Sequence, residues 1–279
     1  MKSMLILTDF SDAAFRAAEY GCQLADSLGI KRIVLYHAYQ TMVTGTDLPV
    51  TTSKNNHDIY LENMEALGLL HDQLKSMSGH AVAIDLLADN TPLHSIINQR
   101  CREEEIDIIV MGVSGKSDLE KLLIGSTTTQ ILETSEVPVL VVPKGTFIGK
   151  GIKTIVFTTD LKDPATVPVE QLYKFLDAFP ADLCVVNVAP AGEEKYLSET
   201  KEAIASLHNL LEKYQPTFHY INEDDTVKGI LAFSEQQHAS LIMAVPKRHS
   251  TFASLFRRSI SKKLAYDSSI PLLSLPATK

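Results

Sequence analysis

Short, uninterrupted apolar runs alternate along the chain with longer segments in which apolar residues recur every three or four positions. A run such as SMLILT at 3–8 is typical of a strand buried on both faces, whereas 57–77 repeats apolar side chains at helical spacing. The pattern predicts strands at 3–8, 32–37, 81–87, 107–112 and 138–142, helices at 11–28, 57–77 and 92–104, and a helix within 119–134. This alternation indicates an α/β fold, with a parallel sheet covered by helices on both faces.

The same order of elements recurs in the second half of the chain. Strands are predicted at 153–158, 183–188, 217–221, 240–245 and 272–275, and helices at 168–178, 194–214, 226–238 and 257–267. The first apolar run of each half ends in a Thr-Asp pair, Thr8-Asp9 and Thr159-Asp160. A repeat of this length indicates a duplicated domain. We therefore predict two tandem doubly wound domains, 1–145 and 151–279, each with a five-stranded parallel sheet.

The last predicted strand of each half, at 138–142 and at 272–275, is short and apolar and would be an exposed edge if left unpaired. We expect the two sheets to pair through these strands within one chain. Further association of whole chains, for example into a homodimer, stays open. The first half is longer because of an insert at 40–56, which is predicted to be a surface loop, with a lid as the alternative.

Composition narrows the class of protein. The chain of 279 residues is long enough for two cores, and its net charge of −8 argues against a nucleic-acid-binding protein. No stretch approaches the ~18 apolar residues that a membrane span needs, and the first apolar run is too short for a signal peptide. The three cysteines lie far apart without CxxC spacing and are expected to be buried, reduced thiols. We predict a cytoplasmic protein with neither a membrane nor a nucleic-acid partner.

Candidate chemistry gathers where the predicted strands of the first half end, which is where open parallel sheets bind ligands. The spacing G-x2-G-x9-G-S places glycines at 112, 115 and 125 before a helix. Glycines let backbone N–H groups approach phosphate oxygens, and a helix N-terminus attracts anions. Lys116 offers a cation, and Asp9 offers a carboxylate for a ribose hydroxyl or for Mg²⁺. The alternative is that these residues only form turns and caps.

The chain resembles the universal stress protein family in its tandem two-domain form. The resemblance lies in LILTDFSDAA (5–14), VLYHAY (34–39), DIIVMGVSG (107–115), GSTTTQIL (125–132) and PVLVVP (138–143). It implies Rossmann-like domains of the adenine nucleotide alpha hydrolase-like kind, and ATP bound by the first one. The residues that the resemblance assigns to the nucleotide site are Asp9, Ala38, Met111, Gly112, Gly115, Gly125, Ser126 and Thr127, and to these we add Lys116.

The second half departs from this motif. Aligning ASLIMAVPK (239–247) with DIIVMGVSG puts Ala244 and Lys247 in place of the first two glycines, and Arg258 in place of the third. Pro246 also removes an N–H donor. We therefore expect no ATP in the second domain. The basic residues at 247–249 and 257–258 form either a solvated loop and helix start or a site for an anion or partner.

Three functions remain open. The leading hypothesis is a nucleotide-binding stress-response or regulatory protein with an unknown protein partner and with little or no turnover, because no paired general base or nucleophile accompanies the binding groups. The second is an interaction module that binds no nucleotide. The third is a slow ATPase, in which Asp9 and a metal-bound water act.

Overall fold

The computed structural model describes residues 1–40, 55–75, 82–113, 126–146, 151–161, 166–190, 198–246 and 254–276. The first half contains β1 (Ser3–Leu7), α1 (Asp12–Leu28), β2 (Arg32–Ala38), α2 (Asn56–Lys75), β3 (Ala83–Asp89), α3 (Leu93–Glu103), β4 (Ile108–Val113), α4 (Ser126–Thr134) and β5 (Val139–Pro143). The second half contains β6 (Thr154–Thr158), α5 (Val169–Leu176), β7 (Asp182–Ala189), α6 (Ser198–Leu211), the short 3₁₀ helix η2 (Glu212–Tyr214), β8 (Thr217–Asn222), α7 (Thr226–Gln236), β9 (Leu241–Ala244), α8 (Ser254–Asp267) and β10 (Leu272–Ser274). Each predicted strand and helix is present.

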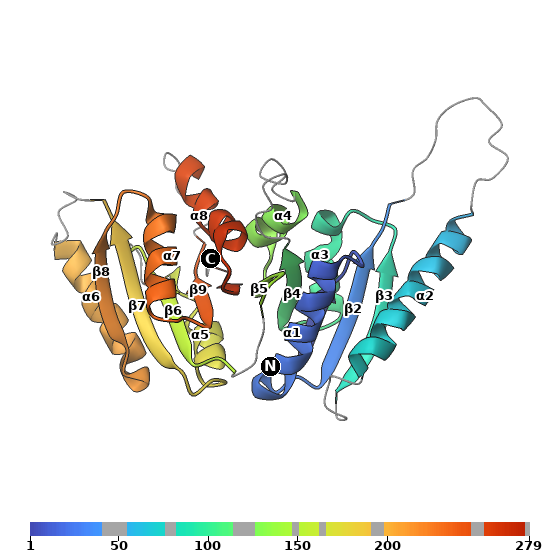
Figure 1. Ribbon diagram of the computed structural model, residues 1–279, viewed down its shortest axis with the longest axis horizontal. Coiled ribbons are helices and arrows are strands. Elements are labelled where there is room, and N and C mark those ends of the chain that lie inside the picture. Colours follow the sequence, from blue (N-terminus) through green and yellow to red (C-terminus); the bar gives the residue numbers. More distant parts are fainter. Residues whose placement is uncertain are drawn as a thin grey trace.

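The strands form one continuous sheet in the order β3-β2-β1-β4-β5-β10-β9-β6-β7-β8 (Figure 1). Within each half neighbouring strands are parallel, which confirms the predicted fold class. The halves meet where β10 pairs antiparallel with β5, so that Leu273 lies opposite Leu140. The two short apolar edges therefore cover one another, as their sequences predict.

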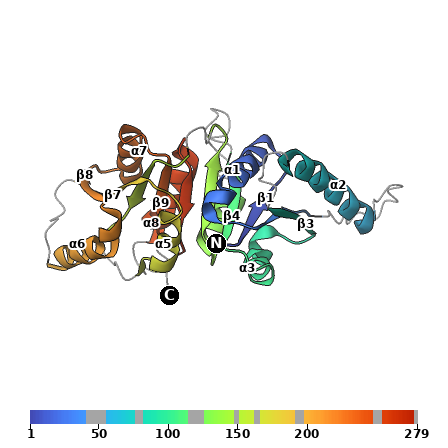
Figure 2. The same ribbon diagram turned by 90° about the horizontal axis from the view of Figure 1, so that it is seen from below.

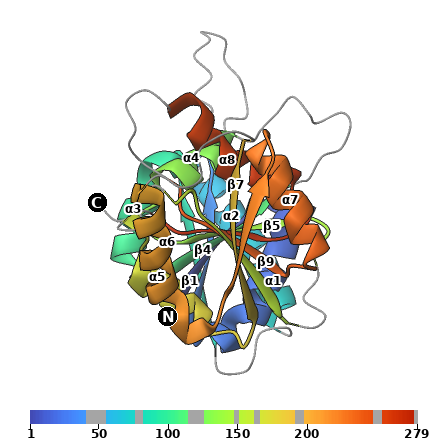
Figure 3. The same ribbon diagram turned by 90° about the vertical axis from the view of Figure 1, so that its left-hand side faces the viewer.

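Helices cover both faces of the sheet. Alternating strand residues face two cores: Met4 and Ile6 belong to the core covered by α1, α2, α5 and α6, whereas Leu5 and Leu7 belong to the core covered by α3, α4, α7 and α8. Helices α2 and α6 lie at opposite ends of the molecule (Figure 2). Viewed along the long axis, the strands cross one another (Figure 3), as the accumulated twist of a wide sheet requires.

Local sequence explains the ends of α1, the helix that follows β1. The Ser11 side chain accepts a hydrogen bond from the Ala14 N–H and caps the N-terminus. At the other end Gly29 adopts the left-handed conformation, with φ 69°, and its N–H bonds the last turn. Within the described ranges, no helix combines the length and the apolar character needed to cross a membrane.

The duplication extends to individual hydrogen bonds. The Thr8 N–H donates to the Tyr36 carbonyl oxygen at 3.0 Å, and the Thr159 N–H donates to Val186 at the same distance. Phe10 and Leu161 follow with positive φ values of 62° and 57°. Residues that occupy the same place in the two halves are called counterparts below.

The register of β4 and β9, the fourth strand of each half, corrects one detail of the sequence alignment. The pairs that fix it are Met4–Ile108 in the first half and Ile155–Leu241 in the second. Counting along each strand makes Val245, not Ala244, the counterpart of Gly112. The sequence alignment was wrong by one residue because Met-Gly-Val and Met-Ala-Val look alike, whereas strand pairing admits only one register.

Candidate functional site

The candidate site lies at the switch in strand order between β1 and β4, from which the first-half sheet extends in both directions. Asp9 follows β1, Ala38 ends β2, and Gly112 lies one residue before the end of β4. The carboxyl ends of parallel strands share one edge of a sheet, so the fold brings these three positions to the same edge. This is the usual location of a ligand crevice in such folds.

A tight turn presents Asp9. The Phe10 N–H donates to Thr8 Oγ1 at 2.9 Å, and the Ser11 N–H donates to Asp9 Oδ1 at 3.0 Å. These bonds fix the Asp9 side chain at the start of α1, where its carboxylate is exposed. The turn therefore holds an accessible oxygen ligand beside the helix N-terminus.

Gly112 has a packing role that the spacing alone did not reveal. A Cβ at this position would lie 2.2 Å from the carbonyl oxygen of Ala13 and 2.8 Å from the backbone nitrogen of Ala14. Only glycine permits the first turn of α1 to lie this close to β4. Its counterpart is Val245, and the corresponding helix α5 begins only at Val169. The first glycine of the motif is therefore required by helix packing, whatever else it does.

Met111 and Ala38 differ in what they can offer a ligand. The Met111 side chain is buried in the core on the α3 side, so a ligand would meet its backbone. Ala38 is half-buried on that same side. Its counterpart Val188 is larger, and Val188 Cγ1 lies 2.6 Å from where a Cβ on Gly229 of α7 would be. In the second half, the larger Val188 side chain therefore takes up space that Ala38 leaves in the first half.

Several predicted site residues lie outside the described residues: Gly115, Lys116 and Gly125. Ser126 is the first residue of α4, and the Thr127 side chain is exposed. Ser259, the counterpart of Ser126, lies inside α8 rather than at its start. Lys247, Arg248 and His249 also lie outside the described residues.

An aromatic row borders the edge and was missed by the sequence analysis. The Phe10 and His37 ring centroids are 4.5 Å apart, and the His37 and Tyr39 rings stack at 6.3 Å. His37 Nδ1 lies 2.8 Å from the Thr8 carbonyl oxygen, where only a donor forms a hydrogen bond. The counterpart Asn187 donates from Nδ2 to Thr159 in the same way. Nδ1 is therefore the donor in this contact. The sequence feature that could have revealed this row is the pair of aromatic residues, Phe10 and Tyr39, that directly follow Asp9 and Ala38.

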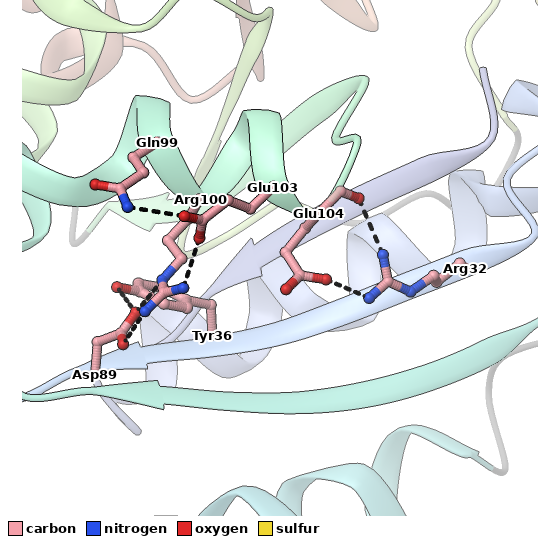
Figure 4. A network of polar contacts seen from close by, with 7 residues as sticks. All are labelled: Arg32, Tyr36, Asp89, Gln99, Arg100, Glu103 and Glu104. Carbon is pink, nitrogen blue, oxygen red and sulfur yellow. Dashed lines mark hydrogen bonds and ion pairs between the residues drawn. The ribbon is translucent and has the colours of Figure 1, made fainter.

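A polar network surrounds Asp89, which pairs in register with Ala38 (Figure 4). Arg100 donates from Nη2 to Asp89 Oδ1 at 2.6 Å and from Nε to Oδ2 at 2.7 Å, and the Tyr36 hydroxyl donates to Oδ2 at 2.9 Å. Glu103 accepts from Arg100 Nη1 and from Gln99. Hydrogen bonding to Asp89 raises the Arg100 pKa, and burial, followed by the bond to Asp89, raises that of Tyr36. Asp89 therefore interacts with a fixed cation and a protonated phenol.

A separate ion-pair group lies at the opposite end of β2. Arg32 donates from Nε to Asp85 Oδ2 at 2.6 Å and from Nη1 to the Glu104 carbonyl oxygen at 3.0 Å (Figure 4 shows Arg32 with Glu104). Its partners are more exposed than Asp89, since the Asp85 side chain is 53% exposed. In the described ranges, no group of three or more histidine, cysteine, aspartate or glutamate side chains is arranged to hold a metal ion.

Comparisons with known proteins identify the family. The model of the universal stress protein family matches residues 1–143, just over half of the chain. The chain therefore belongs to the universal stress protein family, and its repeated halves make it a tandem member.

Two curated relatives match about half of the chain. A universal stress protein of Methanocaldococcus jannaschii is 27% identical over 51% of this chain and 82% of its own length. The universal stress protein YxiE of Bacillus subtilis is 26% identical over 50% of this chain and 97% of its own length. Among solved structures, a universal stress protein from Archaeoglobus fulgidus covers 98% of both chains, with a TM-score of 0.70 and 18% identity. That likeness extends the shared fold to the whole chain.

Proposed function

We propose that the first half binds an adenine nucleotide, ATP with Mg²⁺, and that the protein is a nucleotide-binding stress-response or regulatory protein with little or no turnover. The observation that carries this proposal is the exposed Asp9 carboxylate, held at the start of α1 on the edge shared with Ala38 and Gly112. We also propose that 1–145 and 151–279 are separate domains, of which the first is the nucleotide domain.

The residues present fit such a ligand. Mg²⁺ commonly uses one or two carboxylates and completes its shell with phosphate oxygens and water, so Asp9 suffices without a cluster of acidic residues. Asp9 would hold the metal ion or a ribose hydroxyl, Ala38 would contact the base, and the glycines with Ser126 and Thr127 would receive the phosphates. Met111 would contribute its backbone and Lys116 a positive charge. The bound metal would supply charge neutralisation at the phosphates.

The second half is not proposed to bind ATP. Val245 replaces Gly112, Val188 replaces Ala38, and Ser259 lies inside a helix. The second half therefore lacks the small residues that the first half has at positions 38 and 112. One nucleotide per chain is the expected stoichiometry.

The test is a calorimetric titration with ATP and Mg²⁺, using Asp160→Asn as the matched control for Asp9→Asn. Both aspartates follow a threonine whose Oγ1 accepts from the N–H two residues on, so Asp160→Asn makes the same substitution at the equivalent position of the second half. We expect about one site per chain, lost or weakened at least about ten-fold in Asp9→Asn because a charge-assisted contact disappears, and unchanged in Asp160→Asn. Equal effects of the two variants, or no binding by the wild type, would refute the proposal.

A second candidate function is an interaction module that binds no nucleotide. It is favoured by the packing role of Gly112, since a glycine explained by helix packing is no longer a sign of phosphate binding. A slow ATPase is separated from both by phosphate release: release above background that Asp9→Asn abolishes would establish it. The three cysteines are free and buried, which supports the proposed cytoplasmic location.

A further inference from the structure

The polar network around Asp89 is present in only one of the two halves. Its members in the first half are Tyr36, Asp89 and Arg100, and their counterparts are Val186, Ile221 and Phe233. All three counterparts pack in the apolar core on the same side of the sheet. The second half therefore has the same fold with apolar residues at these positions.

Folding alone gives no reason for a polar set here. A partly buried ion pair must offset the loss of hydration, and well-packed apolar residues commonly serve stability as well or better. The Asp89 side chain is only 13% exposed and that of Arg100 is 24% exposed. The restriction of the network to the first half favours a role that is specific to that half.

Position connects the network to the candidate site. Asp89 is paired in register with Ala38, and its backbone carbonyl accepts the Tyr39 N–H at 2.9 Å. The side chains of Asp89 and Ala38 lie on the same side of the sheet, at the edge where its parallel strands end. A base that contacts Ala38 would lie beside the Asp89 carboxylate.

The carboxylate keeps the capacity to bind a ligand. Its oxygens offer about four acceptor sites. Among the described residues, Tyr36 and Arg100 Nε use Oδ2, and Arg100 Nη2 uses one site of Oδ1. One acceptor site of Oδ1 remains, on a side chain whose orientation Tyr36 and Arg100 fix.

From these observations we infer that Asp89 is a specificity-determining residue, which accepts a hydrogen bond from the amino group of the base. Tyr36 and Arg100 are positioning residues that act through it. Adenine presents an amino donor, whereas a purine without that group leaves the partly buried acceptor unpaired. The inference rests on the proposed nucleotide site and gives it a preference for amino-bearing bases.

The experiment compares the affinities of the full-length chain for ATP and for purine riboside triphosphate, which is ATP without the amino group. We expect the wild type to prefer ATP by about ten-fold or more, as for a hydrogen bond to a charged group. Asp89→Asn should lower this ratio to about three-fold or less, because the acceptor is no longer charged. The matched control is Asp85→Asn, which also removes an arginine ion pair from β3 but away from the edge, and it should keep the wild-type ratio.

The outcomes separate this inference from the proposed function. An unchanged ratio in Asp89→Asn, or a wild type that binds both triphosphates equally, would overturn the inference and leave the nucleotide site intact. A wild type that binds neither would refute the proposed function, and the inference would fall with it. Should Asp89→Asn not fold, Tyr36→Phe replaces it, since this variant keeps the buried ring and removes one hydrogen bond to Asp89; an unchanged ratio there would likewise overturn the inference.

Discussion

The contact between β4 and α1 predicts that Gly112→Ala is strongly destabilising. The added methyl would lie 2.2 Å from the Ala13 carbonyl oxygen, whereas real Cβ contacts are essentially never below 3.0 Å, so the helix must move by about 0.8 Å. The atoms in the way are backbone, and α1 is held by its buried apolar face, so no rotamer change relieves the overlap. Overpacking of this kind lowers the free energy of unfolding by about 3 kcal/mol, the upper end of the usual range.

The matched control is Gly68→Ala in α2, where nothing lies within 4 Å of an added Cβ. Alanine in an open helical position raises the free energy of unfolding by about 0.5–1 kcal/mol.

The assay is urea unfolding followed by circular dichroism. A loss of about 3 kcal/mol lowers the midpoint by about 1 M or more at ordinary slopes. The Gly68→Ala midpoint should rise slightly. A Gly112→Ala midpoint equal to that of the wild type would refute the view that packing on α1 requires this glycine.

Two further predictions concern buried groups. Replacing Tyr36, Asp89 and Arg100 together by valine, isoleucine and phenylalanine should keep or raise the urea midpoint. These apolar residues replace a partly buried ion pair, and the second half already packs them at the counterpart positions. A midpoint lowered by more than about 1 M would contradict this. Burial raises the pKa of the Cys22 and Cys101 thiols to about 12, so both stay protonated below that value. At pH 8 they should react with a thiol reagent only after denaturation, and rapid reaction of the native protein would contradict the burial.

Local patterns were enough to predict the elements and their pairing. The apolar run 3–8 became β1, the helical segment 57–77 became α2, and the unprotected edges at 138–142 and 272–275 became β5 and β10. These predictions depend on the spacing of apolar residues and on the short apolar strand at the end of each half. Both features can be read from a few neighbouring residues in the sequence. The Thr-Asp turn could likewise be found twice because its residues are adjacent.

The parts of the site that the sequence did not reveal depend on distant residues. Asp89 meets Tyr36 across neighbouring strands, and Arg100 reaches it from the following helix, so no window contains the network. Gly112 looked like a phosphate-binding glycine because it fits the G-x2-G-x9-G-S spacing. Its close contact with Ala13 cannot be seen in the sequence. Contacts of this kind follow only from the packed fold.

The antiparallel pairing of β5 with β10 has a genetic consequence. In a two-fold homodimer every substitution occurs in both copies, so a change that suits one site is imposed on the other. Here the two partners are encoded separately, and a single substitution alters one of them. This independence lets one half keep a charged Asp89 and the other an isoleucine in the same sheet. A covalently joined pair can thus divide its tasks, with one half free to specialise while the other retains the shared scaffold.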